Sequence, residues 1–140
     1  MEHNRSLGLL SISRKGGNIV YGEETVGAQT RAGRARLVIL ASDAGAHTLR
    51  RAKSFVAGTR QQLVRLAATK DEMGMAIGRT SLAIAAITDV GLALSLVKTL
   101  DEARHKDVLS VLEEMDRRAR QRQKEAKAHQ QNKRIGKRKK

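Results

Sequence analysis

Cysteine and proline are absent from this 140-residue chain, and aromatic side chains are nearly absent. Without cysteine the protein forms no disulfide and offers no thiolate nucleophile or thiolate zinc ligand. Tyr21 and Phe55 are the two aromatic residues, too few for a platform on which the bases of a single-stranded nucleic acid stack. The absence of proline leaves no residue that interrupts a helix sharply. The composition therefore excludes thiol chemistry and base-stacking modules.

The sequence also has no signal of a metal site or of a membrane segment. Histidine occurs four times, at His3, His47, His105 and His129, without the spacing of metal ligands. No apolar run approaches the roughly 20 residues that cross a bilayer, and the N-terminus lacks the apolar segment of a signal peptide. We therefore expect a cytoplasmic protein with no metal, no cofactor and no membrane partner.

Positive charge dominates and is concentrated at the C-terminus. The chain has 28 Lys and Arg against 14 Asp and Glu, a formal net charge of +14. Residues 117–140 hold 12 of these bases and one acid (+11), which leaves 16 bases and 13 acids (+3) for residues 1–116. Such a tail favours contact with nucleic-acid phosphates over two alternatives, a solubilising tail and an anionic membrane surface. Its candidate phosphate contacts include Arg117, Arg118, Lys137 and Arg138.

Hydrophobic patterning predicts alternating strands and helices. Residues 37–41 form a continuous apolar run typical of a strand buried on both faces. Shorter signals predict further strands at 18–21, 63–67 and 82–87, and helices at 5–13, 23–32, 44–57 and 71–77. We predict an α/β fold, a three-layer α/β/α sandwich with a small mixed four-stranded sheet.

The C-terminal third has a helical pattern. Apolar residues recur every three or four positions from 92 to 115 and predict one long amphipathic helix. Within it, Glu113 and Glu114 each precede an arginine by four residues, the acid-first order that favours ion pairs. The apolar stripe stops at Met115, so we expect a frayed helix or a disordered arm beyond it. The expected organisation is a domain at 1–97, a helical extension at 98–116 and a basic tail at 117–140 that is disordered or ordered by RNA.

Two aspartates raise the possibility of an enzyme. Asp43 and Asp89 each follow an apolar strand, where α/β enzymes place carboxylates that bind Mg²⁺. Both are also explained as caps of the helices that follow them. No phosphate-binding glycine loop and no histidine matched to a serine or threonine completes an active site. We therefore expect that the protein is not an enzyme.

Several short motifs follow one another in an order that points to a family. They are Leu7-Gly8-Leu9-Leu10, Arg14-Lys15-Gly16-Gly17, Gly22-Glu23-Glu24, and the segments 33–44, 73–79 and 86–93. Through these motifs, residues 5–97 resemble the kink-turn-binding ribosomal protein superfamily (L-seven-Ae, L-thirty-e, S-twelve-e and Gadd-forty-five), in particular its small bacterial members. The resemblance implies non-catalytic binding of structured RNA, a kink-turn or ribosomal RNA, by a ribosomal or ribosome-associated protein.

The resemblance also implies where the RNA is bound. Family members contact sheared G·A pairs and an unstacked base with the N-terminus of the second helix and the loop before the last strand. Archaeal members carry an Asn-Glu pair and a Lys one turn later, where this chain has Glu24, Thr25 and Ala28. The implied RNA-binding residues of the body are Lys15, Gly22, Glu23, Glu24, Thr25, Arg31, Arg34, Arg36, Asp43, Arg79, Thr80, Ser81 and Leu82.

Several of these residues have two interpretations. Gly22 allows RNA to approach the backbone closely, or it is a turn glycine. The glutamates Glu23 and Glu24 accept hydrogen bonds from guanine amino groups, or they are acids favoured in the first turn of a helix. Leu82 packs on a base or belongs to the core. The arginines form one RNA face by contacting phosphates, or they are solvated surface.

A second function hypothesis belongs to another class. In the stress-response branch of the same superfamily the fold serves as a protein-interaction adaptor, for which the free face of the long C-terminal helix would be the contact. Adaptors of that branch tend to be acidic, so the +11 tail favours RNA. A third possibility is a homodimer formed by the helix at 92–115; the sequence leaves the oligomeric state open.

Overall fold

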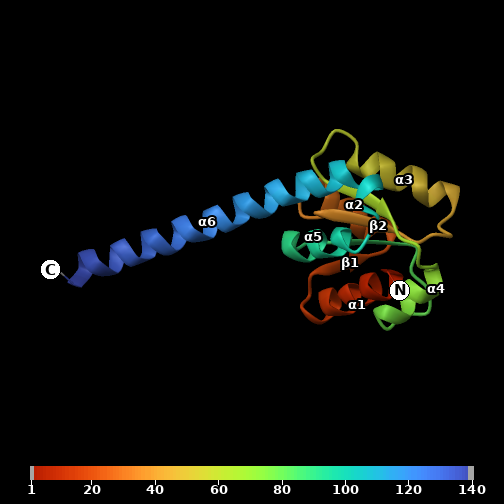
Figure 1. Cartoon of the computed structure of the whole chain (residues 1–140), viewed down its shortest axis with the longest axis horizontal. Helices are drawn as coiled ribbons and strands as arrows, with labels where there is room; N and C mark the ends of the chain where they lie inside the picture. The colour runs from red at the N-terminus through yellow and green to blue at the C-terminus, as the bar shows by residue number, and fades with distance from the viewer. Residues whose placement is uncertain (1, 139–140) are drawn as a thin grey trace.

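The computed structural model describes the backbone of residues 2–138 and the side chains of residues 5–132. Strands and helices alternate through the first two thirds of the chain, and a long helix follows (Figure 1). The elements are α1 (Glu2–Lys15), β1 (Ile19–Tyr21), α2 (Glu23–Arg31), β2 (Leu37–Leu40), α3 (Ala46–Val56), β3 (Gln62–Arg65), α4 (Lys70–Ala76), β4 (Ile84–Ile87), α5 (Val90–Lys98), the 3-10 turn η1 (Glu102–Arg104) and α6 (Lys106–Arg138). The predicted α/β class is confirmed.

The four strands form one mixed sheet in the order β1-β4-β2-β3. Strand β4 is antiparallel to both of its neighbours, and β2 is parallel to β3. At one end of β4, Ile87 lies opposite Ile19 and Leu37; at the other, Ile84 lies opposite Leu40. We call these the Ile87 end and the Ile84 end; they are about 10 Å apart along the strand. The Gly22 N–H bonds the Ile84 carbonyl at one end, and the Arg36 N–H bonds the Ile87 carbonyl at the other.

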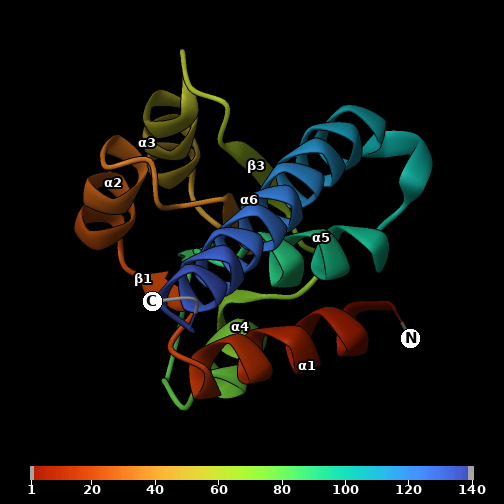
Figure 2. The same cartoon turned by 90° about the vertical axis from the view of Figure 1, so that its left-hand side faces the viewer.

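Alternating side chains of the central strands build two cores. Leu37 and Ile39 of β2 pack with Leu10 of α1, Met73 of α4 and Leu96 of α5. On the opposite face of the sheet, Val38 and Leu40 pack with Val26 of α2 and Ala52 of α3. Helices therefore cover both faces of the sheet, which confirms the three-layer sandwich (Figure 2). At the edge of the sheet, β3 contributes the buried Val64 to the first of these cores, and its other residues are partly buried or exposed.

The single helix predicted over 92–115 was also wrong, because the chain turns after Lys98. Thr99 donates its hydroxyl to the Leu96 carbonyl at 2.7 Å, and the Asp101 carboxylate accepts from the Ala103 N–H at 3.1 Å. Such local side-chain hydrogen bonds compete with a continuing helix. Helix α6 then packs back against α5, and Leu112 joins the same core as Leu96. The periodicity persists through the break because both helices face one core.

The basic tail continues the helix as far as Arg138. At 33 residues, α6 is about 50 Å long, and it projects from the body as a straight rod (Figure 1). Its composition favours helix. In the first half of α6, ion pairs join Glu114 to Arg118 at 2.8 Å and Asp116 to Arg120 at 3.1 Å. The expected Glu113 pair is not formed among the described side chains. In the described part of the chain, no helix is long and apolar enough to cross a bilayer.

The docking of α6 leads to a stability prediction. Leu112 is fully buried in the core, so Leu112→Ala is expected to lower the free energy of unfolding by about 2 to 3 kcal/mol. Urea unfolding measures it. The control, Ser110→Ala, changes an exposed residue of the same helix and is expected to stay within about 0.5 kcal/mol. Equal effects of the two variants would show that the part of α6 around Leu112 is not packed in the folded core.

Candidate nucleic-acid interface

The N-terminus of α2 lies at the Ile84 end of the sheet. Gly22 takes φ 91° and ψ 145° between β1 and α2, a conformation that residues with a Cβ rarely adopt. Its N–H donates to the Ile84 carbonyl at 3.3 Å, which ties the turn to β4. The first intrahelical bond runs from Val26 N–H to the Gly22 carbonyl, and among the described residues no side chain caps the helix. The N–H groups of residues 23–25 are therefore available to a ligand.

The loop before β4 lies beside this helix terminus. Arg79 places its guanidinium over the Tyr21 ring, 4.4 Å from the centroid, and also donates to the Tyr21 hydroxyl. Because Tyr21 immediately precedes Gly22, this contact joins the loop to the start of α2. We call Gly22–Thr25 together with residues 79–81 the α2–loop surface. The guanidinium of Arg14 lies against Gly78 and adds a second cation at its border.

The loop is held by close packing against α4. Arg79 donates its N–H to the Gly74 carbonyl at 2.7 Å, and Leu82 donates to the Lys70 carbonyl at 2.9 Å. A Cβ on Gly74 would lie 2.7 Å from the Ser81 nitrogen and 2.8 Å from its Cα. No real Cβ approaches backbone so closely, so Gly74 is required for the position of the loop.

The two glutamates at the start of α2 have different surroundings. Glu23 accepts hydrogen bonds from Thr48 at 2.9 Å and from Arg51 at 3.1 Å, and Arg51 also lies over the Phe55 ring. Glu23 therefore links α2 to α3. Glu24 is exposed and makes no side-chain hydrogen bond or ion pair within the described residues. Of the pair, Glu24 is the one whose carboxylate is open to a ligand.

The expected single face of arginines was wrong. Arg36 donates its N–H to the Ile87 carbonyl at 2.9 Å, which places it at the opposite end of the sheet from Gly22. Arg34 lies near Arg36, and Arg31 is the last residue of α2. Lys15 ends α1 three residues before Asn18, whose carbonyl accepts from Thr88 at the same Ile87 end. Because α2 runs from one end of the sheet to the other, its two termini cannot share one site.

The structure confirms one of the two predicted aspartate caps and the core interpretation of Leu82. Asp43 does not cap the helix that follows it, since α3 begins at Ala46 with Gly45 at the N-cap. Its carboxylate instead accepts from the Lys70 N–H at 2.8 Å, at the start of α4. Asp89 does cap α5, accepting from Leu92 N–H at 2.9 Å, as predicted. Leu82 is 6% exposed, which confirms the core interpretation and leaves its side chain no surface for a base.

The tail residues on the candidate list lie on α6. Arg117 and Arg118 are exposed, and Arg118 pairs with Glu114. Lys137 and Arg138 lie in the last turns of the helix, outside the residues whose side chains the structure describes.

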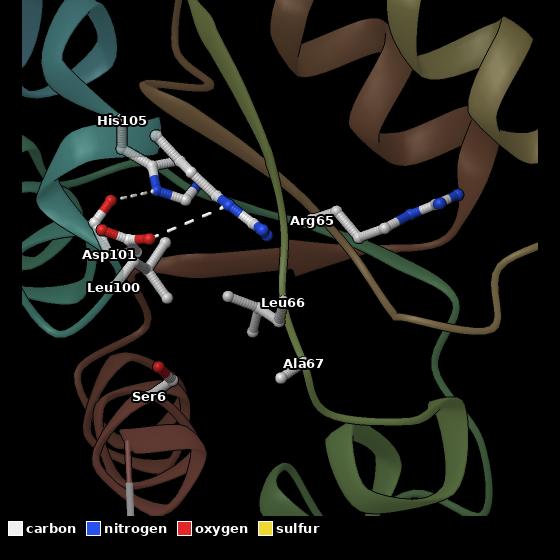
Figure 3. A pocket seen from close by; sticks show the side chains of 8 residues that line it. Ser6, Arg65, Leu66, Ala67, Leu100, Asp101 and His105 are labelled. Atoms are coloured by element: carbon white, nitrogen blue, oxygen red, sulfur yellow. Dashed lines mark hydrogen bonds and ion pairs between the residues drawn. The ribbon is translucent and has the colours of Figure 1, made fainter.

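A hollow of about 440 Å³ lies beside edge strand β3, and none of its described lining residues belongs to the α2–loop surface (Figure 3). His105 and Ser6 both line it, but His105 Nδ1 bonds the Asp101 carbonyl at 2.8 Å and the Ser6 hydroxyl bonds Thr99 at 2.8 Å. This hollow therefore contains no hydroxyl nucleophile paired with a histidine base. Within the part of the chain that the structure describes, no cluster of histidines and carboxylates fits a metal ion.

Comparisons with known proteins give a shared fold. No family model matches the sequence, and no curated protein matches it significantly. A protein of unknown function from Bacillus halodurans is 26% identical over 68% of this chain and 95% of its own, with a TM-score of 0.64. A 15.5 kD RNA-binding protein from Giardia lamblia is 20% identical over 70% of this chain and 83% of its own, with a TM-score of 0.60.

Proposed function

We propose that the protein binds structured RNA without catalysing a reaction, as a kink-turn binder in a ribosomal or ribosome-associated particle of the cytoplasm. One observation carries this proposal: the uncapped start of α2 lies beside a loop whose arginine is held by Tyr21. A protein with the same fold, from Giardia lamblia, is an RNA-binding protein. The net charge of +14 supports a polyanionic partner.

At the α2–loop surface, backbone and side chains have separate roles. The N–H groups of residues 23–25 donate to phosphate or base acceptors, and the lack of a side chain on Gly22 lets the RNA backbone come close. Glu24 accepts from a guanine amino group of a sheared G·A pair. Arg79, oriented by Tyr21, donates to a phosphate and positions the RNA.

Shape recognition and affinity come from different parts of the chain. The α2–loop surface sets two cations, Arg14 and Arg79, against the exposed acid Glu24, so its electrostatic attraction for RNA is small. Residues 117–140 carry +11, and the described side chains of α6 in this segment are mostly exposed. Affinity that depends on phosphate neutralisation therefore comes from α6 and is weakened by salt.

One observation favours a second function, that of a protein-interaction adaptor. Met75 is 78% exposed and Ile12 55% exposed on the α1–α4 side of the body. Met75 lines a shallow hollow with Leu7 and Ala76. An adaptor would lose its partner through Met75→Lys, whereas RNA binding at the α2–loop surface would be unchanged.

Arg79→Met tests the proposed surface. We expect about tenfold weaker binding to a kink-turn RNA, because a charge-assisted hydrogen bond contributes about 1.5 kcal/mol. An electrophoretic shift at about 0.15 M salt measures it. Arg50→Met removes an equal charge from an exposed position of α3 and is expected to change binding less than about twofold. If both variants weaken binding equally, only the total charge matters and the proposed site is wrong.

A further inference from the structure

Arginines from three segments that are distant in sequence meet at the Ile87 end of the sheet. Arg36 precedes β2, Arg60 precedes β3, and Arg118 and Arg122 belong to α6. Together they line a hollow of about 180 Å³, which we call the arginine hollow. Gln61, Val90, Met115 and Ala119 complete its lining.

The arginine hollow has an excess of positive charge. Glu114 is its neighbouring acid, with carboxylate oxygens 2.8 Å from Arg118 and 3.8 Å from Arg60. Arg36 and Arg122 make no ion pair among the described residues. Among the described residues that line the hollow are four arginines and no acid. Arg36 also lines an adjacent hollow with Arg34, which extends the cationic surface along the body.

The arginine hollow is near both parts of the chain that we propose to contact RNA, the α2–loop surface and α6. It is separated from the α2–loop surface by the length of β4, about 10 Å along the strand. Its lining residues on α6 run from Met115 to Arg122, just beyond Leu112, which is buried in the core. An RNA that follows α6 toward the body reaches this hollow first.

We propose that the arginine hollow is a second RNA-binding site, which takes backbone phosphates of a duplex segment. The chain then holds two segments of one RNA, a kink at the α2–loop surface and an adjoining helix in the hollow and along α6. The two-segment arrangement rests on the proposed function; phosphate binding in the hollow does not.

The chemistry of the hollow favours a nucleic-acid backbone. All four cations are arginines, whose planar guanidinium matches phosphate oxygens in a bidentate manner. Arg118 and Arg122 are one helical turn apart, about 6 Å along α6, so adjacent phosphates can each meet a guanidinium. The apolar lining residues Val90, Met115 and Ala119 offer a surface for a ribose between them.

The test uses the full chain and a plain RNA duplex without a kink. The variant with Arg36→Gln, Arg60→Gln and Arg122→Gln is expected to bind the duplex about 30-fold more weakly at 0.15 M salt. The slope of log K against log salt should flatten by about 2 to 3, since each lost phosphate contact removes about 0.9 or less. The matched control replaces Arg50, Lys53 and Arg65 with Gln, three exposed bases away from the hollow, and should weaken binding less than about threefold.

Equal losses in the two triple variants, or no loss in the first, would overturn the second site. Arg122 is exposed and unpaired in the described structure, so Arg122→Glu alone repeats the test if the triple variant does not fold. Discrimination between a kink-turn RNA and the same RNA without its G·A pairs should be unchanged in the triple variant. If the unmodified chain does not discriminate between these two RNAs, the proposed function is wrong. The comparison of duplex binding between the two triple variants would still test phosphate binding in the hollow.

Discussion

Gly74→Val is expected to lower the free energy of unfolding by about 3 to 4 kcal/mol and to weaken kink-turn binding. A Cβ at this position would lie 2.7 Å from Ser81 N, 2.8 Å from Ser81 Cα and 2.9 Å from the Thr80 carbonyl carbon. These are backbone atoms, which cannot move aside as a flexible side chain can. The loop that carries Arg79 must therefore shift away from α4. Urea unfolding and RNA titration of the folded fraction measure the two effects.

Gly8→Ala is the control for this substitution. Gly8 also lies within a helix, but no atom lies within 4 Å of a Cβ built there. The change is expected to raise the free energy of unfolding by about 0.5 to 1 kcal/mol, since alanine favours helix more than glycine does. RNA binding should stay the same. If Gly74→Val is as stable as the unmodified chain, the loop is not packed against α4 as the structure has it.

Ending the chain at Gln123 is expected to weaken RNA binding at least about 100-fold near 0.15 M salt. The truncation removes eight Lys and Arg and one Glu, all beyond the part of α6 that packs on the body. Counterion release makes the affinity of such contacts strongly dependent on salt, so the salt slope should flatten as well. Filter binding over a range of salt concentrations measures both effects.

The same truncation leaves the arginine hollow and the α2–loop surface in place. The ratio of affinities for a kink-turn RNA and its G·A-replaced form should therefore be unchanged. Stability should also change by less than about 0.5 kcal/mol, because the described side chains removed are exposed. Unaltered affinity in the truncated chain would show that α6 does not contact the RNA.

Sequence patterns predicted the sandwich because its signals are local. The apolar run at 37–41 gave a strand buried on both faces, and glycines separated most of the other elements. The end of α5 was missed because apolar spacing continues across the turn, from Leu96 to Leu112. The turn depends on local hydrogen bonds made by the side chains of Thr99 and Asp101. Such bonds compete only weakly with a continuing helix, and they produce no recognisable pattern in the sequence.

The candidate site was predicted only in part, because its residues come together through sheet register. The proximity of Gly22 and Arg79 follows from β1 pairing with β4, and the family resemblance implied it. The separation of Arg36 from that surface follows from the same register. One signal was present in the sequence and missed: Thr69 and Glu72 have the spacing of a capping box, which indicates the start of α4. The link from Glu23 to Arg51 requires the packing of α2 on α3 and has no sequence signal.

The most direct measurement compares the affinity of the full chain for a kink-turn RNA with its affinity for the same RNA after replacement of the sheared G·A pairs, at about 0.15 M salt. The full chain is needed because Leu112 of α6 belongs to the core. If the α2–loop surface recognises the kink, the intact RNA binds at least about tenfold more tightly, a difference of about 1.4 kcal/mol. Equal affinities would show that the protein binds only phosphates through its arginines and α6, and would contradict shape-specific binding at the start of α2.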